Sequence, residues 1–276
     1  MRNYRIEEKI EMIPVMYKIL IGNLKSRKNN FKNLKYGENI KQYYRIYNGD
    51  RDKPIIFFIH GGGWWHGSPK TSSCIGKFFN DLGYTVILPA YRLVPLYKYP
   101  IQINDIFKSI KCYLSSEENL ESRKFIVVGF SAGGELATNL VFNSKKQLEF
   151  GIDKSIFKGM ITLAGVLDFE KCISKHSIRL IENYAGKEID FSESNPINLL
   201  NENIDIPVLC LHGDKDPLID IDNSISFINK INSLNGNGKL KILKGKHHSD
   251  IISLVINKGE KESKVILDFI EDVWRK

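Results

Sequence analysis

Ser131 lies in a Gly-Phe-Ser-Ala-Gly motif at residues 129–133, with a glycine two positions away on either side. A short β-branched run at 125–128 precedes the motif, and a helical pattern at 131–142 begins within it. An attacking hydroxyl in acyl transfer must project from a tight turn, where side chains at the two glycine positions would clash. The amino end of the following helix favours developing negative charge. The pattern predicts a nucleophile elbow, and a further Gly134 argues against a chance match.

A second glycine-rich stretch, His-Gly-Gly-Gly-Trp at residues 60–64, follows an apolar run that predicts a neighbouring strand. Glycines allow backbone N–H groups to approach an oxyanion closely. We expect Gly62 and Gly63 to donate such groups together with Ala132, the residue after the serine. A glycine-rich turn without any role is the alternative. We expect His60 to hold the loop in shape, because the base of this arrangement comes last in the chain.

Two aspartates follow the buried strand predicted at 206–211 and compete for the role of the acid. Asp214 lies within the turn, where aspartate is favoured by local hydrogen bonding alone. Asp216 precedes Pro217, which favours an extended backbone, so we favour Asp216. Its carboxylate would fix the tautomer of a histidine and stabilise the imidazolium.

Two adjacent histidines, His247 and His248, follow the last predicted strand and supply the candidate base. The chain order Ser, Asp, His is that of the α/β-hydrolase arrangement. The residues alone leave the choice between the two open. The other histidines after His60 are expected to be structural or surface residues; they are His66, His176 and His212.

Strands alternate with helices along most of the chain, which predicts βαβ units and a largely parallel sheet flanked by helices. Continuous apolar runs such as 55–59 suit strands that are buried on both faces. Strands are predicted at 42–47, 54–60, 84–88, 125–128, 157–163, 206–211 and 239–243, and helices at 71–82, 101–114, 131–142, 220–234 and 263–275.

The 276 residues suit a single α/β domain, 1–276. About forty residues separate the strands ending near 163 and starting at 206, which is longer than an ordinary connection. We therefore expect cap or lid segments at 166–200 and at 1–40, which together would form a small helical cap.

The composition is that of an ordinary globular protein, with 42% hydrophobic and 26% charged residues. The net charge of +8 raises nucleic-acid binding as a question, but no binding motif is present and we expect none. The apolar run at 10–21 is interrupted by Lys18 and is too short to span a bilayer, so it predicts a packed amphipathic helix.

The four cysteines are widely spaced, which argues against a zinc site and a disulfide framework. We expect reduced thiols in a cytoplasmic protein, and no metal. The cysteines are Cys74, Cys112, Cys172 and Cys210.

In its motifs the chain resembles the acetyl-esterase and hormone-sensitive-lipase-like groups of α/β-hydrolases. The matching pieces extend from about residue 40 to the carboxyl end; they are 60–64, Tyr91-Arg92-Leu93-Val94-Pro95 with Pro100 and Asp105, 129–134, and 212–217. The resemblance implies an α/β-hydrolase fold and hydrolysis of carboxylic esters without a cofactor. It implies Asp216 as the acid and, three residues after Gly245, His248 as the base.

The chain departs from this pattern at two positions. Phe130 precedes the serine where the lipase-like group has an acidic residue, and Leu96 replaces a glutamate. Phe130 resembles the acetyl-esterase branch. The stretch 247–250 is also similar to the histidine loop of kynurenine formamidases, although His247 and Ser249 depart from it, so formamide hydrolysis remains an alternative.

Bulky residues beside the serine suggest a pocket for a small ester with a short acyl group. We expect Trp64, Trp65 and Phe130 to line its walls, with ordinary core packing as the alternative. A non-catalytic ligand-binding homologue is a third interpretation, but the chain retains serine, aspartate and histidine.

Overall fold

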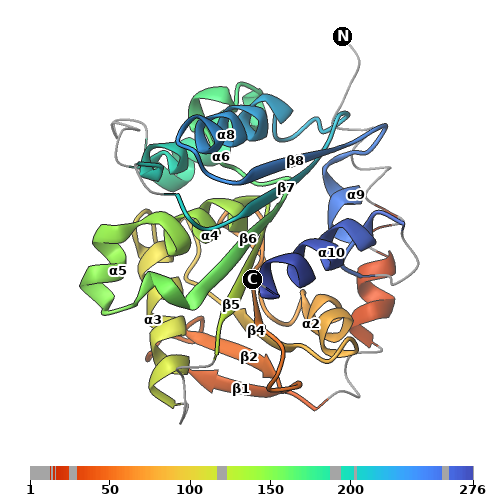
Figure 1. Cartoon of the computed structure of the whole chain (residues 1–276). Helices are drawn as coiled ribbons and strands as arrows, with labels where there is room; N and C mark the ends of the chain where they lie inside the picture. Colours follow the sequence, from red (N-terminus) through yellow and green to blue (C-terminus); the bar gives the residue numbers. More distant parts are fainter. Residues whose placement is uncertain are drawn as a thin grey trace.

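The computed structural model of the chain is an eight-stranded sheet with helices on both faces (Figure 1). It describes residues 13, 15, 17–24, 30–116, 123–186, 194–201, 204–256 and 261–275. The strands are β1 (Lys32–Lys35), β2 (Tyr43–Tyr47), β3 (Ile55–Ile59), β4 (Thr85–Pro89), β5 (Phe125–Phe130), β6 (Phe157–Leu163), β7 (Val208–Gly213) and β8 (Gly238–Leu243). The α-helices are α2 (Ser73–Asn80), α3 (Ile101–Ser116), α4 (Ala132–Phe142), α5 (Ser144–Phe150), α6 (Lys175–Ala185), α8 (Ile221–Ser233), α9 (His248–Ser253) and α10 (Ser263–Trp274).

The sheet is mostly parallel, as the alternating pattern predicts. Its order is β1-β2-β4-β3-β5-β6-β7-β8, and only the β1–β2 and β2–β4 pairs are antiparallel. The carboxyl ends of β3, β5, β7 and β8 therefore meet at one edge. In open α/β sheets this is the edge where ligands bind.

The core consists of two layers, one on each face of the sheet. Strand β3 is buried along its whole length, and its side chains alternate between the layers. Ile55, Phe57 and Ile59 pack with α3, α4 and α8, whereas Ile56 and Phe58 pack with α2 and α10. Figure 1 shows these helix groups on opposite sides of the sheet. Burial on both faces explains the continuous apolar run of this strand.

Each predicted strand and helix within the described residues is present with shifted ends, and four elements lack a clear pattern in the sequence. Strand β1 is exposed throughout and has no apolar alternation. Helices α5 and α9 are short. Helix α6 lies in the long segment between β6 and β7 and packs into the core through Ile181 and Tyr184.

The two expected cap segments are only partly within the described residues, since 1–12, 14, 16, 25–29 and 187–193 lie outside them. Residues 17–24 are helical. Asn23 accepts a hydrogen bond from the Cys74 backbone N–H and donates one to the Thr71 carbonyl, which joins this helix to the start of α2. A cap role for either segment stays a prediction.

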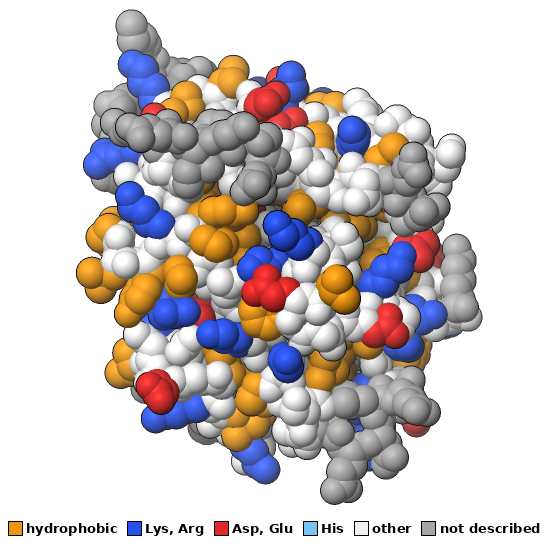
Figure 2. All heavy atoms as spheres, turned by 90° about the vertical axis from the view of Figure 1, so that its left-hand side faces the viewer, with side chains coloured by type: hydrophobic (Ala, Val, Ile, Leu, Met, Phe, Trp, Pro, Cys, Tyr) orange, Lys and Arg blue, Asp and Glu red, His pale blue; other side chains and the backbone are white. Residues whose placement is uncertain are grey.

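The described residues contain no helix long and apolar enough to cross a membrane. On the face turned toward the viewer in Figure 2, basic and acidic side chains are interspersed with apolar ones.

Asp105 of α3 joins three distant parts of the fold. Its buried carboxylate accepts hydrogen bonds from the Arg92 guanidinium at 2.8 Å and from the Gln42 amide at 2.9 Å. It also accepts one from the Arg92 backbone N–H at 3.0 Å. The loop after β4 and the residue before β2 are thereby fixed to α3.

We predict that Asp105→Ala lowers the free energy of unfolding by about 3 kcal/mol, because Arg92 and Gln42 lose their shared acceptor in a buried place. Urea unfolding followed by circular dichroism measures this loss. The control is Glu149→Ala, which breaks a solvent-exposed pair with Lys146 and should cost under about 1 kcal/mol. Equal losses for the two variants would contradict the role of Asp105.

Candidate active site

Ser131 forms a sharp turn between β5 and α4. Its backbone has φ 52° and ψ −121°, and its N–H donates to the Leu163 carbonyl at 2.9 Å. A Cβ added at Gly129 would overlap the carbonyl oxygen of Gly133, and one added at Gly133 would overlap that of Ile59. Both glycines are therefore required by close backbone approach, as the elbow motif predicts.

The glycine loop after β3 lies directly against the elbow. A Cβ added at Gly61 would be 2.9 Å from the Ser131 Cβ. Gly62 and Gly63 have φ of 113° and 58°, in the region that favours glycine. Ala132 is the first residue of α4, so its N–H has no acceptor within the helix. The structure thus brings Gly61, which directly precedes the two expected oxyanion glycines, and Ala132 to the turn that carries the serine.

His60 supports this loop from within the core. Its Nδ1 lies 2.8 Å from the Gly61 carbonyl oxygen, and its ring stacks on Tyr91 at a centroid distance of 4.3 Å. The Tyr91 hydroxyl donates to the His60 carbonyl at 3.0 Å. Burial lowers the pKa of His60 to about 4, so the imidazole is neutral at pH 7.

Asp216 lies in the loop after β7; its side chain is fully buried, and both of its carboxylate oxygens are hydrogen-bonded. Oδ1 accepts from the backbone N–H groups of Leu218 and Ile219, each at 2.9 Å. Oδ2 lies 2.7 Å from Nδ1 of His248 and 3.1 Å from Nε2 of His212. Burial alone would raise the pKa of Asp216, but the two histidines hold it below its ordinary value. The carboxylate therefore stays ionised at neutral pH.

His212 is a neighbour of this site that the sequence did not reveal. It is fully buried; its Nδ1 lies 2.8 Å from the Ser224 hydroxyl and its Nε2 lies 3.0 Å from the Ile219 carbonyl. These contacts orient its ring toward Asp216. One signal in the sequence could have indicated that His212 contacts the acid. It is a histidine near the end of an otherwise apolar strand, four residues before Asp216.

The two adjacent histidines have different surroundings. His248 is buried, contacts Asp216, and lies with its ring 5.2 Å from the Phe130 ring, measured between centroids. His247 precedes α9, and its backbone N–H donates to the Asp250 carboxylate at 2.9 Å. His248 is therefore paired with the buried carboxylate, whereas His247 caps the start of α9.

Asp214, the other acid considered from the sequence, lies in the turn after β7. Its carboxylate accepts a hydrogen bond from the Gly245 backbone N–H at 2.6 Å. This bond ties the turn after β7 to the loop after β8. Asp214 therefore shapes the loops around the site and makes no described contact with either histidine of the pair at 247–248.

The three expected pocket residues lie in different environments. Trp64 is 1% exposed and belongs to the core, where its indole N–H donates to Glu135 at 3.0 Å. We expected Trp64 to line the pocket wall, but its indole is instead enclosed by helix α4 and by Tyr184 of α6. Trp65 is 59% exposed, and Phe130 is partly buried against the histidine ring.

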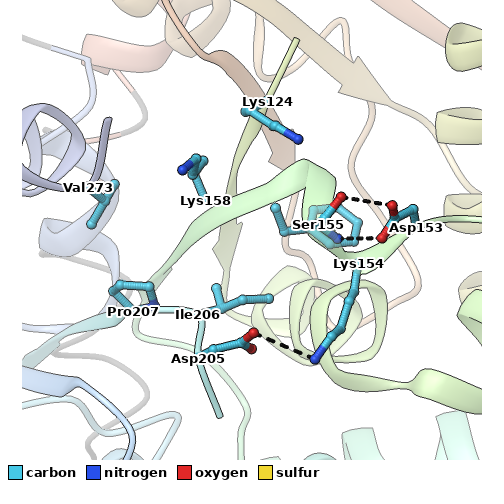
Figure 3. Close-up of a pocket in the computed structure, with 10 residues that line it drawn as sticks. Lys124, Asp153, Lys154, Ser155, Lys158, Asp205, Ile206, Pro207 and Val273 are labelled. Carbon is cyan, nitrogen blue, oxygen red and sulfur yellow. Dashed lines mark hydrogen bonds and ion pairs between the residues drawn. The ribbon is translucent and has the colours of Figure 1, made fainter. Parts of the chain in front are cut away.

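A groove of about 550 Å³ lies at the opposite edge of the sheet, at the amino ends of β5, β6 and β7. Lys154 pairs with Asp205 at 3.6 Å across it (Figure 3). It contains none of the residues described at the elbow. Its lining residues are Lys124, Asp153, Lys154, Ser155, Phe157, Lys158, Asp205, Ile206, Pro207 and Val273.

Comparison with known proteins gives matches over most of the chain. The BD-FAE family matches residues 43–231, more than half of the sequence. Esterase LipC of Mycobacterium tuberculosis is 25% identical over 218 residues, which cover 72% of this chain and 54% of LipC. A kynurenine formamidase of Meyerozyma guilliermondii is 27% identical over 210 residues, which cover 69% of this chain and 76% of that protein. The chain thus spans about half the length of LipC.

A solved structure confirms the fold. Esterase B from Lactobacillus rhamnosis superposes with a TM-score of 0.74 at 16% identity, covering 98% of this chain and 97% of that one. The predicted α/β-hydrolase fold is therefore confirmed.

We predict that Gly133→Ala destabilises the protein by about 3 kcal/mol or more, because the new methyl group overlaps backbone oxygens that cannot move independently. Thermal and urea unfolding measure the loss. The control is Gly159→Ala in β6, where the nearest atoms are side-chain carbons of Phe269 and Val273 at 3.3 Å. A well-folded Gly133→Ala protein with unchanged stability would contradict the described elbow geometry.

Proposed function

This chain belongs to the BD-FAE family, and on that basis we propose that it hydrolyses small carboxylic esters through Ser131, Asp216 and His248. The observation that carries the proposal is the 2.7 Å contact between Asp216 Oδ2 and His248 Nδ1, beside the serine turn. An acid that is hydrogen-bonded to Nδ1 fixes the tautomer in which Nε2 can act as a base. Relatives that are named esterases support the same reaction.

The first half of the reaction forms an acyl-enzyme. Ser131 Oγ attacks the ester carbonyl carbon while His248 Nε2 takes the hydroxyl proton. The carbonyl π electrons move to oxygen, and this oxyanion accepts hydrogen bonds from the N–H groups of Gly62, Gly63 and Ala132. When the carbonyl re-forms, the C–O bond to the alcohol breaks, and the imidazolium gives its proton to the departing oxygen.

The second half returns the free enzyme. Water attacks the acyl carbon while His248 takes one of its protons, and the tetrahedral intermediate uses the same N–H groups. Collapse breaks the bond to Ser131 Oγ, which is reprotonated as the carboxylic acid departs. Asp216 stabilises the imidazolium in both halves, since its pKa lies below the ordinary value and it remains charged.

Phe130 supports a preference for short acyl groups. Its ring is partly buried and packs on the His248 ring. We infer that this ring, next to the serine in the chain and against the proposed base, narrows the acyl side of the site. The residue also separates this chain from the lipase-like pattern, in which an acidic residue precedes the serine.

Hydrolysis of a formamide such as N-formylkynurenine is the second candidate. It rests on the kynurenine formamidase relative and on the similar histidine loop at 247–250. The same serine, acid and base would act on a formyl carbon, with an amine as the leaving group. Ester and formamide hydrolysis differ in their substrates. A non-catalytic homologue would turn over neither the ester nor the formamide.

We predict that Ser131→Ala lowers kcat for p-nitrophenyl acetate by about 10⁴-fold or more, because the covalent step has no attacking group. His248→Ala should cause a loss of similar order, since the serine then lacks its base. His247→Ala should retain activity, because that residue precedes α9 and its described contact is with Asp250, not Asp216. Steady-state kinetics on folded variants measures these effects, and reversed results for the two histidines would overturn the assigned base.

We predict that kcat/KM across p-nitrophenyl acetate, butyrate and octanoate falls with increasing acyl length, because Phe130 restricts the acyl side. Phe130→Ala should shift the preference toward longer chains. A series that peaks at octanoate would contradict the short-acyl proposal.

Direct comparison with N-formylkynurenine decides between the two candidate reactions, and a higher kcat/KM for the formamide would favour the second.

A further inference from the structure

Glu135 is a buried carboxylate in the first turn of α4, four residues after Ser131. Its side chain has four described hydrogen-bond contacts, all from donors. The Trp64 indole N–H donates at 3.0 Å, the Asn139 amide donates at 2.8 Å, and the Tyr184 hydroxyl lies 3.2 Å from each oxygen. The esterase mechanism makes no direct use of this group.

The Trp64 contact reaches the oxyanion loop itself. Trp64 follows Gly63 and has a positive φ of 61°, which is rare for a residue with a bulky side chain. Its carbonyl accepts the Val94 backbone N–H at 3.1 Å, while its indole is held by Glu135. Trp64 is therefore held in the left-handed turn after the glycines by hydrogen bonds of both its backbone carbonyl and its indole.

The Tyr184 contact extends the same arrangement to helix α6. The Tyr184 ring stacks on the Trp64 ring at 4.2 Å with an interplanar angle of 2°. Leu180, one turn earlier in α6, contacts Gly63 closely: a Cβ added at Gly63 would be 2.9 Å from the leucine Cδ2. One carboxylate thus connects the elbow helix, the oxyanion loop and the helix that covers it.

A buried carboxylate without a cationic partner among the described residues is costly. Burial raises the pKa of Glu135 to about 8, although the hydrogen bonds from Trp64, Tyr184 and Asn139 oppose this rise, so the neutral carboxylic acid is the main form at pH 7. An apolar side chain could fill such a site without that cost. Unlike an apolar residue, a glutamate can fix the position of the Trp64 indole through a hydrogen bond. This positioning is a physical reason for a glutamate here.

We propose that Glu135 is a positioning residue for the oxyanion hole. Its carboxylate holds the Trp64 indole, and Trp64 in turn orients the backbone N–H groups of Gly62 and Gly63 toward the developing oxyanion. Through Tyr184 it also ties this loop to α6. The inference rests on the proposed hydrolase function, since it assigns Glu135 a part in transition-state stabilisation.

Glu135→Gln tests the role with little change in volume. The glutamine replaces one acceptor oxygen by an NH₂ group. The Tyr184 hydroxyl can accept from this group, but Trp64, which faces Oε2, or Asn139, which faces Oε1, loses its acceptor. We expect kcat for p-nitrophenyl acetate to fall about tenfold to a hundredfold, less than removal of an oxyanion donor outright, with KM within about threefold of the wild type. Affinity for a trifluoromethyl ketone, which forms an oxyanion on the serine, should fall in parallel with kcat.

Trp64→Phe removes the indole N–H and leaves an aromatic ring in place. If the loop is held through this hydrogen bond, the double variant Glu135→Gln/Trp64→Phe loses no more kcat than the more impaired single variant. Additive losses would overturn the route through Trp64. The control for lost stability is Thr138→Val, which removes a buried hydrogen bond from the same helix to the Gly134 carbonyl.

The outcomes separate the two proposals. Absence of turnover in the wild type overturns the proposed function. An active wild type whose Glu135→Gln variant keeps its kcat, or loses stability like Thr138→Val without a selective loss of kcat, overturns the role of Glu135 alone. A fall in kcat and in ketone affinity at nearly constant KM supports it.

Discussion

The crowding of backbone around Ser131 is the constraint on which the rest of the site depends. Gly61, Gly129 and Gly133 lie where an added Cβ would collide with neighbouring backbone or with the serine itself. Such an approach requires β3 and β5 to be neighbours in the parallel sheet. The sheet order thus determines that the glycine loop and the elbow meet.

The proposed acid and base lie in loops that follow two other strands at the same edge of the sheet. Strands β7 and β8 run in parallel, and the loops that follow them carry Asp216 and His248. Burial of the aspartate would favour its neutral form, but two histidines and two backbone N–H groups favour the anion. The outcome is a charged, oriented carboxylate in a dry place, which is what a catalytic histidine needs to keep its tautomer.

Much of this arrangement could be predicted from the sequence because it depends on local patterns. The apolar run of β3 indicates burial on both faces, and the glycines around Ser131 indicate a tight turn. The roles of His212 and Glu135 could not be predicted in this way, since each depends on contacts between residues far apart in the chain. The environment of Trp64 also depends on a distant residue. Its position beside the glycines suggested a pocket wall, whereas its indole lies in the core and donates a hydrogen bond to Glu135.

We propose that Ser131 is an activated nucleophile. Its most direct test is the reaction of the folded wild-type protein with a fluorophosphonate, followed by peptide mapping of the adduct by mass spectrometry. We expect a single phosphonylated peptide, modified at Ser131, with labelling that becomes far slower in His248→Ala. A protein that stays unlabelled, or that carries the adduct on another residue, would contradict it.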